Sequence, residues 1–219
     1  KKYFLPVISG NVSFYNETNK IGISPTPVIG MIGLIKNTNS SNKKNLLKEN
    51  DKIFLIGKKI NNISCSSFLE RIILKNNKNL GPPPPINYNE EIKNGNFVLN
   101  LFKNNLIKYC NDVSSGGTII SLLKMLINKQ FGVEIEESFT NNTNNNQIFY
   151  KILFGENAGN YIVIINNEEK VKELAKKNKV SLFKIGIMKK NYLNINNQII
   201  KLNELKNNFE NNFFNYINN

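Results

Sequence analysis

The pattern of apolar and polar positions along the chain predicts strands that alternate with helices. Runs rich in β-branched and aromatic residues predict strands at 3–8, 26–35, 52–57, 106–109, 161–165 and 183–187. A hairpin is predicted at 193–202, with its turn at Asn196 and Asn197. Apolar residues at helical spacing predict helices at 67–74, 89–105, 118–127 and 168–177, and from 203 onward. This alternation indicates a mixed α/β or α+β fold.

Polarity divides the chain into two blocks. The first, 1–36, is apolar and strand-like, and it cannot bury its own faces without other strands. Residues 37–50 are rich in Ser, Asn and Lys and predict a linker or surface loop, after which 51–219 form the second block. Within that block we interpret the prolines at 82–85 as a rigid connector rather than a ligand for a signalling domain. We expect the polar stretch 139–147 to be a loop too polar to pack.

A turn of small and polar residues follows the first predicted strand. Gly10 lets a ligand approach the backbone, while Asn11 and Ser13 offer an amide oxygen and a hydroxyl. Side chains alternate along extended backbone, so Asn11 and Ser13 would point the same way while Val12 points into the core. Such hard oxygen ligands suit a phosphate or a hydrated Mg²⁺ ion. An ordinary Gly-Asn turn is the alternative, and local chemistry alone favours it.

A second loop, 111–117, opens onto the predicted helix 118–127. A Ser/Gly loop at the N-terminus of a helix can bind an anion, whereas an Asp in the loop can cap the helix. We predict that Asp112 caps it.

The net charge of +13 would ordinarily point to nucleic acid or an anionic membrane as a partner. Arg71 is the only arginine, however, and the lysines are scattered among Asn, Ile and Phe throughout the chain. Specific readers of nucleic acid use arginine for bidentate base contacts. The drift of an AT-rich genome explains the composition better, and nucleic-acid binding is the least favoured function.

Missing residue types exclude several kinds of chemistry. The chain has no histidine, which excludes an imidazole relay and, with only Cys65 and Cys110 present, makes a zinc site untenable. The two distant cysteines do not suggest a disulfide framework. No apolar run is long enough to span a bilayer and nothing resembles a signal peptide, so we expect a cytoplasmic protein without a membrane partner.

Four segments occur in an order that resembles a known family. They are Gly-Asn-Val-Ser-Phe-Tyr-Asn-Glu at 10–17, Pro-Thr-Pro-Val-Ile-Gly at 25–30, Asp-Val-Ser-Ser-Gly-Gly at 112–117 and Leu-Phe-Gly-Glu at 153–156. This order looks like the second half of phosphoribosylformylglycinamidine (FGAM) synthase, the synthetase subunit of purine biosynthesis, over nearly the whole chain. The first two segments are specific to that enzyme. The other two are shared across a superfamily that includes aminoimidazole ribonucleotide (AIR) synthase and selenophosphate synthetase.

The resemblance implies a fold, a reaction and a site. Residues 1–36 would end the second ATP-binding, AIR synthase N-terminal-like subdomain, and 51–219 would form the AIR synthase C-terminal-like α+β domain. The family converts formylglycinamide ribonucleotide, ATP and glutamine-derived ammonia to the amidine, ADP and phosphate. It does so by phosphorylating the amide oxygen before ammonia displaces the phosphate. Carried over by position, Gly10 would contact ATP, Asn11 would bind Mg²⁺ and Ser13 would contact the substrate.

The resemblance also says what this chain lacks. The family's catalytic histidine and its other Mg²⁺ carboxylates lie in a first half that is absent here, so we assign no catalytic residue and expect the chain alone to be inactive. The implied partners are that missing N-terminal half, a glutamine amidotransferase subunit and a small bridging subunit.

Some positions depart from the family pattern. The family usually has a histidine where Asn111 stands and an acidic residue where Ser115 stands. It usually has Ser-Gln-Gly-Arg where this chain has Asn157, Ala158, Gly159 and Asn160, and the lost arginine removes a phosphate or structural partner. Another enzyme of the superfamily, or a degenerate non-catalytic domain of the same fold, therefore stays open as an alternative.

Overall fold

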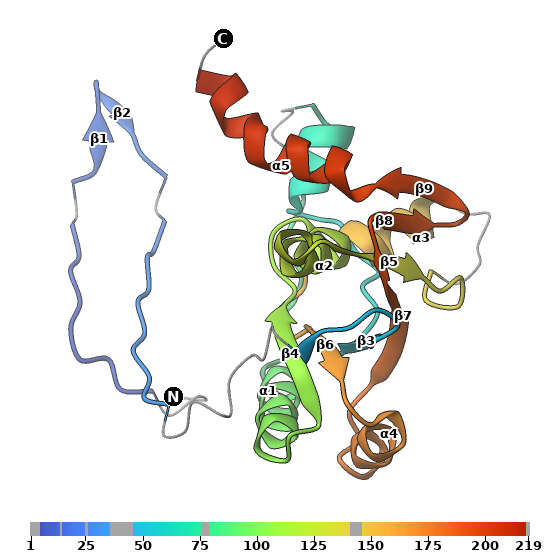
Figure 1. The fold of residues 1–219 in the computed structure, drawn as a ribbon. Coiled ribbons are helices and arrows are strands. Elements are labelled where there is room, and N and C mark those ends of the chain that lie inside the picture. Colours follow the sequence, from blue (N-terminus) through green and yellow to red (C-terminus); the bar gives the residue numbers. More distant parts are fainter. Residues whose placement is uncertain are drawn as a thin grey trace. The chain divides into compact units, whose positions relative to one another are not determined.

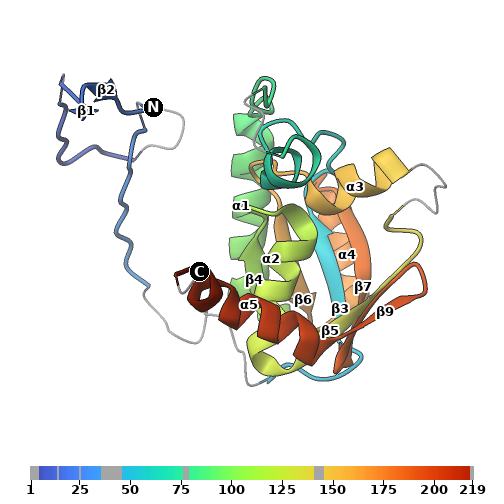
Figure 2. The same ribbon diagram turned by 90° about the horizontal axis from the view of Figure 1, so that it is seen from above.

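The chain divides into two units with very different internal structure, Lys1–Asn39 and Ser40–Asn219, and each is taken by itself below. The computed structural model describes residues 5–13, 15–24, 26–35, 46–75, 79–140 and 146–217, with side chains as far as Asn211. Figure 1 and Figure 2 show the ribbon in two views related by a right-angle turn.

The described part of the first unit contains a short antiparallel ribbon, β1 (Glu17–Thr18) and β2 (Ile21–Gly22). Its turn residues, Asn19 and Lys20, have positive φ angles of 53° and 62°. The strands predicted at 3–8 and 26–35 are wrong at 5–8 and 26–35, which form no regular structure and are exposed; Tyr3 and Phe4 lie outside the described residues. A strand needs a hydrogen-bonded neighbour, and the described part of this unit supplies none there.

A seven-stranded sheet is the centre of the second unit, with the strand order β4-β6-β3-β7-β5-β8-β9. All neighbouring pairs are antiparallel except β5 and β8, which run parallel. The strands are β3 (Lys52–Ile56), β4 (Ile107–Asp112), β5 (Phe131–Ile135), β6 (Tyr161–Ile165), β7 (Leu182–Lys190), β8 (Tyr192–Ile195) and β9 (Gln198–Lys201).

Both faces of this sheet are covered by helices. Figure 1 shows α2 (Gly117–Leu126) and α5 (Leu202–Ile217) on one side and α1 (Tyr88–Lys103) and α4 (Glu168–Lys177) on the other. Because side chains alternate along a strand, Ile53 and Leu55 of β3 enter one hydrophobic cluster while Phe54 and Ile56 enter the other. A central strand buried on both faces has to be apolar at successive positions, which explains the uninterrupted apolar runs in β3 and β6.

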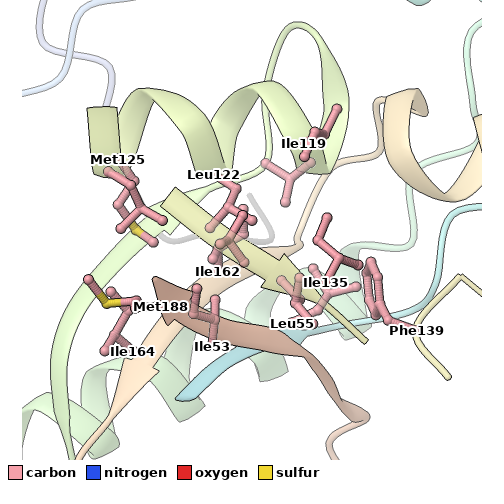
Figure 3. Close-up of a cluster of buried hydrophobic side chains, with 14 of the residues drawn as sticks. Ile53, Leu55, Ile119, Leu122, Met125, Ile135, Phe139, Ile162, Ile164 and Met188 are labelled. Atoms are coloured by element: carbon pink, nitrogen blue, oxygen red, sulfur yellow. The ribbon is translucent and has the colours of Figure 1, made fainter. Parts of the chain in front are cut away.

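The cluster under α2 has more members than the one on the opposite face, and Figure 3 shows part of it. Ile119, Leu122 and Met125 descend from α2 at helical spacing toward Ile162 and Ile164 of β6. Leu122, Ile162 and Ile164 are fully buried. Burial of this kind stabilises the fold by about 1.5–3 kcal/mol for each large aliphatic side chain.

Two asparagines define where helices begin on the opposite face. The side chain of Asn87 accepts a hydrogen bond from the Glu90 amide at 3.1 Å at the start of α1. The side chain of Asn167 does the same for the Lys170 amide at 3.0 Å at the start of α4. Each satisfies one amide that the first turn leaves without a partner.

Several elements differ from the prediction. Strand β5 and helix α3 (Asn146–Phe154) were not predicted, and the helix predicted at 67–74 contains the short π-helix η3 (Leu69–Ile73). The expectation that 139–147 is too polar to pack is wrong at Phe139 and Thr140, which are both 1% exposed. The Phe139 ring fills the α2 cluster, and the Thr140 hydroxyl donates to the Glu137 carbonyl at 3.2 Å. Residues 141–145 lie outside the described part.

The end of the predicted linker packs on the second unit. Leu47 is 7% exposed within the α2 cluster, and the Asn50 amide donates to the Met188 carbonyl at 2.9 Å. Residues 36–45 lie outside the described part of the chain. In the part that is described, no helix combines the length and the hydropathy that crossing a bilayer requires.

Candidate functional site

The turn predicted to bind a ligand, Gly10–Ser13, lies in an open stretch of the first unit. Gly10, Asn11 and Ser13 are all exposed, and a Cβ added at Gly10 would meet no atom within 4 Å. Val12 is 77% exposed, so the expectation that it points into a core is wrong within the described residues. The structure leaves the three candidate residues together and accessible, without enclosing them.

One contact gives this turn local order. The side-chain amide of Asn16 donates to the Ser13 carbonyl at 2.8 Å. This bond uses the main chain of Ser13 and does not involve its hydroxyl. The donor set then consists of the Asn11 amide oxygen and the Ser13 hydroxyl, beside a glycine backbone. Hard oxygen atoms of this kind fit Mg²⁺, and the hydroxyl can also donate a hydrogen bond to a phosphate.

The second predicted loop lies between β4 and α2. Asp112 is the last residue of β4, where it pairs with Tyr161, and it does not cap α2. The N-cap is instead Gly116, with φ 89° and no side-chain hydrogen bond to the helix, so the predicted capping role of Asp112 is wrong. Two internal bonds shape the loop: the Ser114 amide donates to the Ser121 hydroxyl, and the Gly117 amide donates to the Ser114 carbonyl.

The carboxylate of Glu156 joins this loop to a third one. Its Oε1 atom accepts the amide of Gly116 at 2.8 Å and the amide of Ser67, also at 2.8 Å. Glu156 ends the Leu-Phe-Gly-Glu segment, to which the sequence assigned no individual role. The contact was not predictable, because its three residues lie far apart in the sequence.

Glycine permits the close packing around that carboxylate. A Cβ at Gly155 would lie 2.1 Å from Ile60 Cγ2 and 2.5 Å from the Asn62 carbonyl oxygen. A Cβ at Gly117 would lie 2.5 Å from the backbone carbon of Phe154. The start of α2 therefore rests directly on the end of α3, which only glycine at these positions allows.

Asn160, one of the departures from the family pattern, is a structural residue. It is 5% exposed, its Oδ1 accepts the Lys58 amide at 3.2 Å and its Nδ2 donates to the Lys58 carbonyl at 2.9 Å. Gly57, with φ 116°, makes room for it, since a Cβ there would lie 2.0 Å from Asn160 Oδ1. The Asn160 side chain thus bonds to both the amide and the carbonyl of Lys58, as the backbone of a neighbouring strand would. The contact lies just after the end of β3 and just before the start of β6.

Four buried polar atoms have no partner within the described residues, and three of them belong to residues in or beside these loops. Within the described residues the atoms are Asn94 Oδ1, Thr118 Oγ1, Asn157 Oδ1 and Asn194 Oδ1. Thr118 lies in the first turn of α2, Asn157 follows Glu156, and the Asn94 amide donates to the Gly159 carbonyl at 2.9 Å. Unpaired buried polar atoms are costly and mark places that water or a ligand completes.

Two titratable groups of the second unit lie outside the motif loops. The thiol of Cys110 on β4 has its pKa raised to about 12, first by burial and then by Asp112. The carboxyl of Glu168 has its pKa lowered to about 2, through hydrogen bonds from Lys172 and Lys52. No group of three or more metal-ligating Cys, Asp or Glu side chains occurs within the described ranges. A protonated thiol is a poor nucleophile, and Cys110 packs against the hydrophobic cluster on the α1 and α4 face of the sheet.

The comparisons with known proteins agree on one family. Residues 48–193 match the family described as AIR synthase related protein, C-terminal domain. Phosphoribosylformylglycinamidine synthase subunit PurL of Pelagibacter ubique is 39% identical over 195 residues, which is 88% of this chain and 26% of that protein. The same subunit from Bartonella quintana is 32% identical over 216 residues, covering 97% of this chain and 28% of that protein. The chain thus spans about a quarter of the length of the curated relatives that it matches.

Solved structures show the same fold. Thermotoga maritima PurL complexed with FGAR superposes with a TM-score of 0.59 at 12% identity, covering 75% of this chain and 29% of that one. Thermotoga maritima PurL complexed with ATP gives 0.52 at 11% identity, covering 75% and 27%. The resemblance and the mixed α/β fold predicted from the sequence are both confirmed. The chain belongs to the family of AIR synthase related proteins, whose C-terminal domain it carries at residues 48–193.

Proposed function

We propose that this chain forms part of a phosphoribosylformylglycinamidine synthase. That enzyme would use ATP and glutamine-derived ammonia to convert formylglycinamide ribonucleotide to the amidine in purine biosynthesis. The observation that carries the proposal is the 32% identity to a PurL subunit over 216 residues, since an alignment covering 97% of the chain includes both units. A match to the C-terminal domain alone would support only the superfamily.

Within that function, the Gly10–Ser13 turn is our candidate ligand site. Gly10 would lie against ATP, Asn11 would give its amide oxygen to Mg²⁺ and Ser13 would contact the ribonucleotide. Their exposure and their oxygen donors support these roles. Mg²⁺, when bound, would offset the negative charge of the phosphates.

The same proposal assigns the domains and partners. Residues 1–36 would end the second ATP-binding subdomain, 37–50 would link it, and 51–219 would be the AIR synthase C-terminal-like domain. The exposed apolar side chains of the first unit support a need for further strands, because Val28, Ile32 and Leu34 are each more than nine-tenths exposed. The missing N-terminal half would supply both those strands and the catalytic groups. A glutamine amidotransferase and a small bridging subunit would be further partners, in the cytoplasm.

A chimera tests the proposed function. The segment of Pelagibacter ubique PurL that this chain matches is replaced by the chain, and amidine formation is measured with formylglycinamide ribonucleotide, ATP and ammonia. We expect turnover that depends on all three. A soluble, folded chimera without turnover contradicts the proposal, and turnover by the chain alone contradicts the need for an N-terminal half.

The same chimera tests Asn11. Loss of a residue that only supports a metal ligand typically costs about 10–100-fold in metal affinity or activity. Loss of the ligand itself in Asn11→Ala should therefore lower turnover by at least about tenfold and shift the Mg²⁺ dependence. Asn208→Ala, an exposed asparagine of α5, is the matched control and should leave turnover unchanged. Equal activity of the two variants across a Mg²⁺ titration would remove Asn11 from the site without affecting the family-level proposal.

A further inference from the structure

A carboxylate of the protein itself lies at the N-terminus of α2. Amides in the first turn of a helix have no partner within the helix and give that end a partial positive charge. The N-cap of α2 is a glycine, which has no side chain to satisfy them. The group found there is the Glu156 carboxylate, which accepts the Gly116 amide at 2.8 Å.

The same oxygen holds a second segment. Glu156 Oε1 also accepts the amide of Ser67 at 2.8 Å, at the start of the helical turn that leads into η3. An oxygen that accepts two amides is bound as one oxygen of a phosphate would be in such a cradle. The arrangement therefore resembles an occupied anion site in which the anion is covalently part of the protein.

The backbone before Glu156 is fixed by packing. Gly155 leaves no room for a Cβ between Ile60 and the Asn62 carbonyl, and its amide donates to the Lys151 carbonyl at 3.0 Å. The carboxylate thus starts from a set position at the end of α3. Three segments that are distant in sequence, at Ser67, Gly116 and Glu156, converge on one charged atom.

We propose that Glu156 is a positioning residue that acts as the internal anion of the α2 N-terminus and fixes the 114–117 loop to the Ser67 loop. A ligand phosphate could then not use the Gly116 and Gly117 amides, since the Glu156 carboxylate accepts the first and the Ser114 carbonyl accepts the second. The inference uses only the second unit and stands whether or not the proposed function is correct.

When the carboxylate is removed, a free anion such as phosphate should be able to bind in its place. In Glu156→Ala of the 219-residue chain, added inorganic phosphate should shift the Ser67 and Gly116 amide signals in NMR spectra in a saturable way. Thr118 Oγ1, buried and unpartnered within the described residues, is available in the same first turn. Wild type should show no such shifts. Without phosphate, the two amides should exchange with solvent about tenfold faster or more in the variant, because a charge-assisted hydrogen bond is lost.

Two further variants make the test decisive. Glu156→Gln keeps both hydrogen bonds and removes only the charge, so it should slow amide exchange again while still allowing weak phosphate-dependent shifts. Glu137→Ala, at an exposed glutamate, controls for the change in net charge and should behave as wild type. If phosphate moves neither amide in the folded Ala variant, or in the Gln variant should the former fail to fold, the internal-anion role is overturned. Equal shifts in wild type overturn it as well.

Discussion

The two units of this chain contain similar residues in opposite surroundings. In the first unit Val28, Ile32 and Leu34 are 94%, 97% and 97% exposed. In the second unit Ile53 and Ile162 are both 0% exposed. Each group belongs to an apolar run rich in β-branched residues that predicts a strand equally well.

The difference lies in the neighbours rather than in the residues. Ile53 of β3 has a paired strand on either side, opposite Ile164 of β6 and Gly186 of β7. The described residues at 26–35 have no such neighbours, and exposed apolar side chains contribute nothing to stability. Residues with a high strand propensity therefore form a strand only where a neighbouring strand pairs with them.

Hydrogen exchange should show the largest contrast between the units. Amides of β6, paired on both sides and buried, should exchange only on global unfolding, at least about a thousandfold more slowly than amides at 26–35. Mass spectrometry of peptides from the native chain measures both. Similar protection at 26–35 would mean that the first unit has found strand partners, for example in a second copy.

A pair of identical substitutions comes next in size. Leu122→Ala, at a residue that is 0% exposed, should lower the free energy of unfolding by about 2–5 kcal/mol, because it leaves a cavity under α2. Leu34→Ala, at a residue 97% exposed, should change it by less than about 0.5 kcal/mol. Urea denaturation of the 219-residue chain gives both values. A comparable loss at Leu34 would contradict the exposed state of the first unit.

The asparagines that depart from the family pattern can be separated within the second unit. Asn160→Ala should cost about 1–3 kcal/mol, because it leaves the backbone amide and carbonyl of Lys58 without partners. Asn157→Ala removes a side-chain oxygen that has no partner within the described residues and should cost much less. Thermal unfolding of the two variants compares them directly. Equal costs would refute the structural role of Asn160.

The smallest effect is expected from a surface ion network of the second unit. Lys52 and Lys172 both pair with Glu168, the latter at 2.5 Å, and hold the pKa of that carboxyl at about 2 against 4.5. A lowered folded-state pKa gives stability that is complete above about pH 4.5 and is lost as the pH falls toward 2. Glu168→Gln should therefore flatten stability over that range, by no more than about 1 kcal/mol because solvent screens the pairs.

Glu169→Gln is the control for that experiment. It makes the same change of charge in the same turn of α4, but Glu169 forms none of the ion pairs found within the described residues. Urea denaturation at several pH values between 2 and 5 compares the two variants. If both flatten the profile equally, general charge rather than the Glu168 network sets the pH dependence.

Elements with local signals were predicted well. Helix α4 begins and ends where its charges and spacing indicate, and the hairpin of β8 and β9 turns at Asn196 and Asn197 with φ angles of 49° and 63°. Asparagine tolerates positive φ better than most residues, so the position of this turn can be predicted from the sequence. Strand β5 was missed because its five residues include Gly132 and Glu134, which weaken an apolar pattern.

The candidate site was predictable only in part. The order of the four motifs identified the family, because that order can be read along the chain without knowing the fold. The roles of Glu156 and Asn160 were not predictable, since each bonds to backbone groups that only the folded chain brings near. Gly10, Asn11 and Ser13 remain predictions, in a segment whose described neighbours do not enclose them.

The strand order has a consequence for how the protein forms on the ribosome. The central strand β3 is made before both of its partners, β6 and β7, which follow more than a hundred residues later. Closing so long a loop is slow, and an unpaired apolar strand is prone to aggregation while it waits. The nascent chain therefore leaves both edges of β3 unpaired until β6 emerges and one edge unpaired until β7 emerges, and a chaperone that covers an apolar strand would be useful over this stretch.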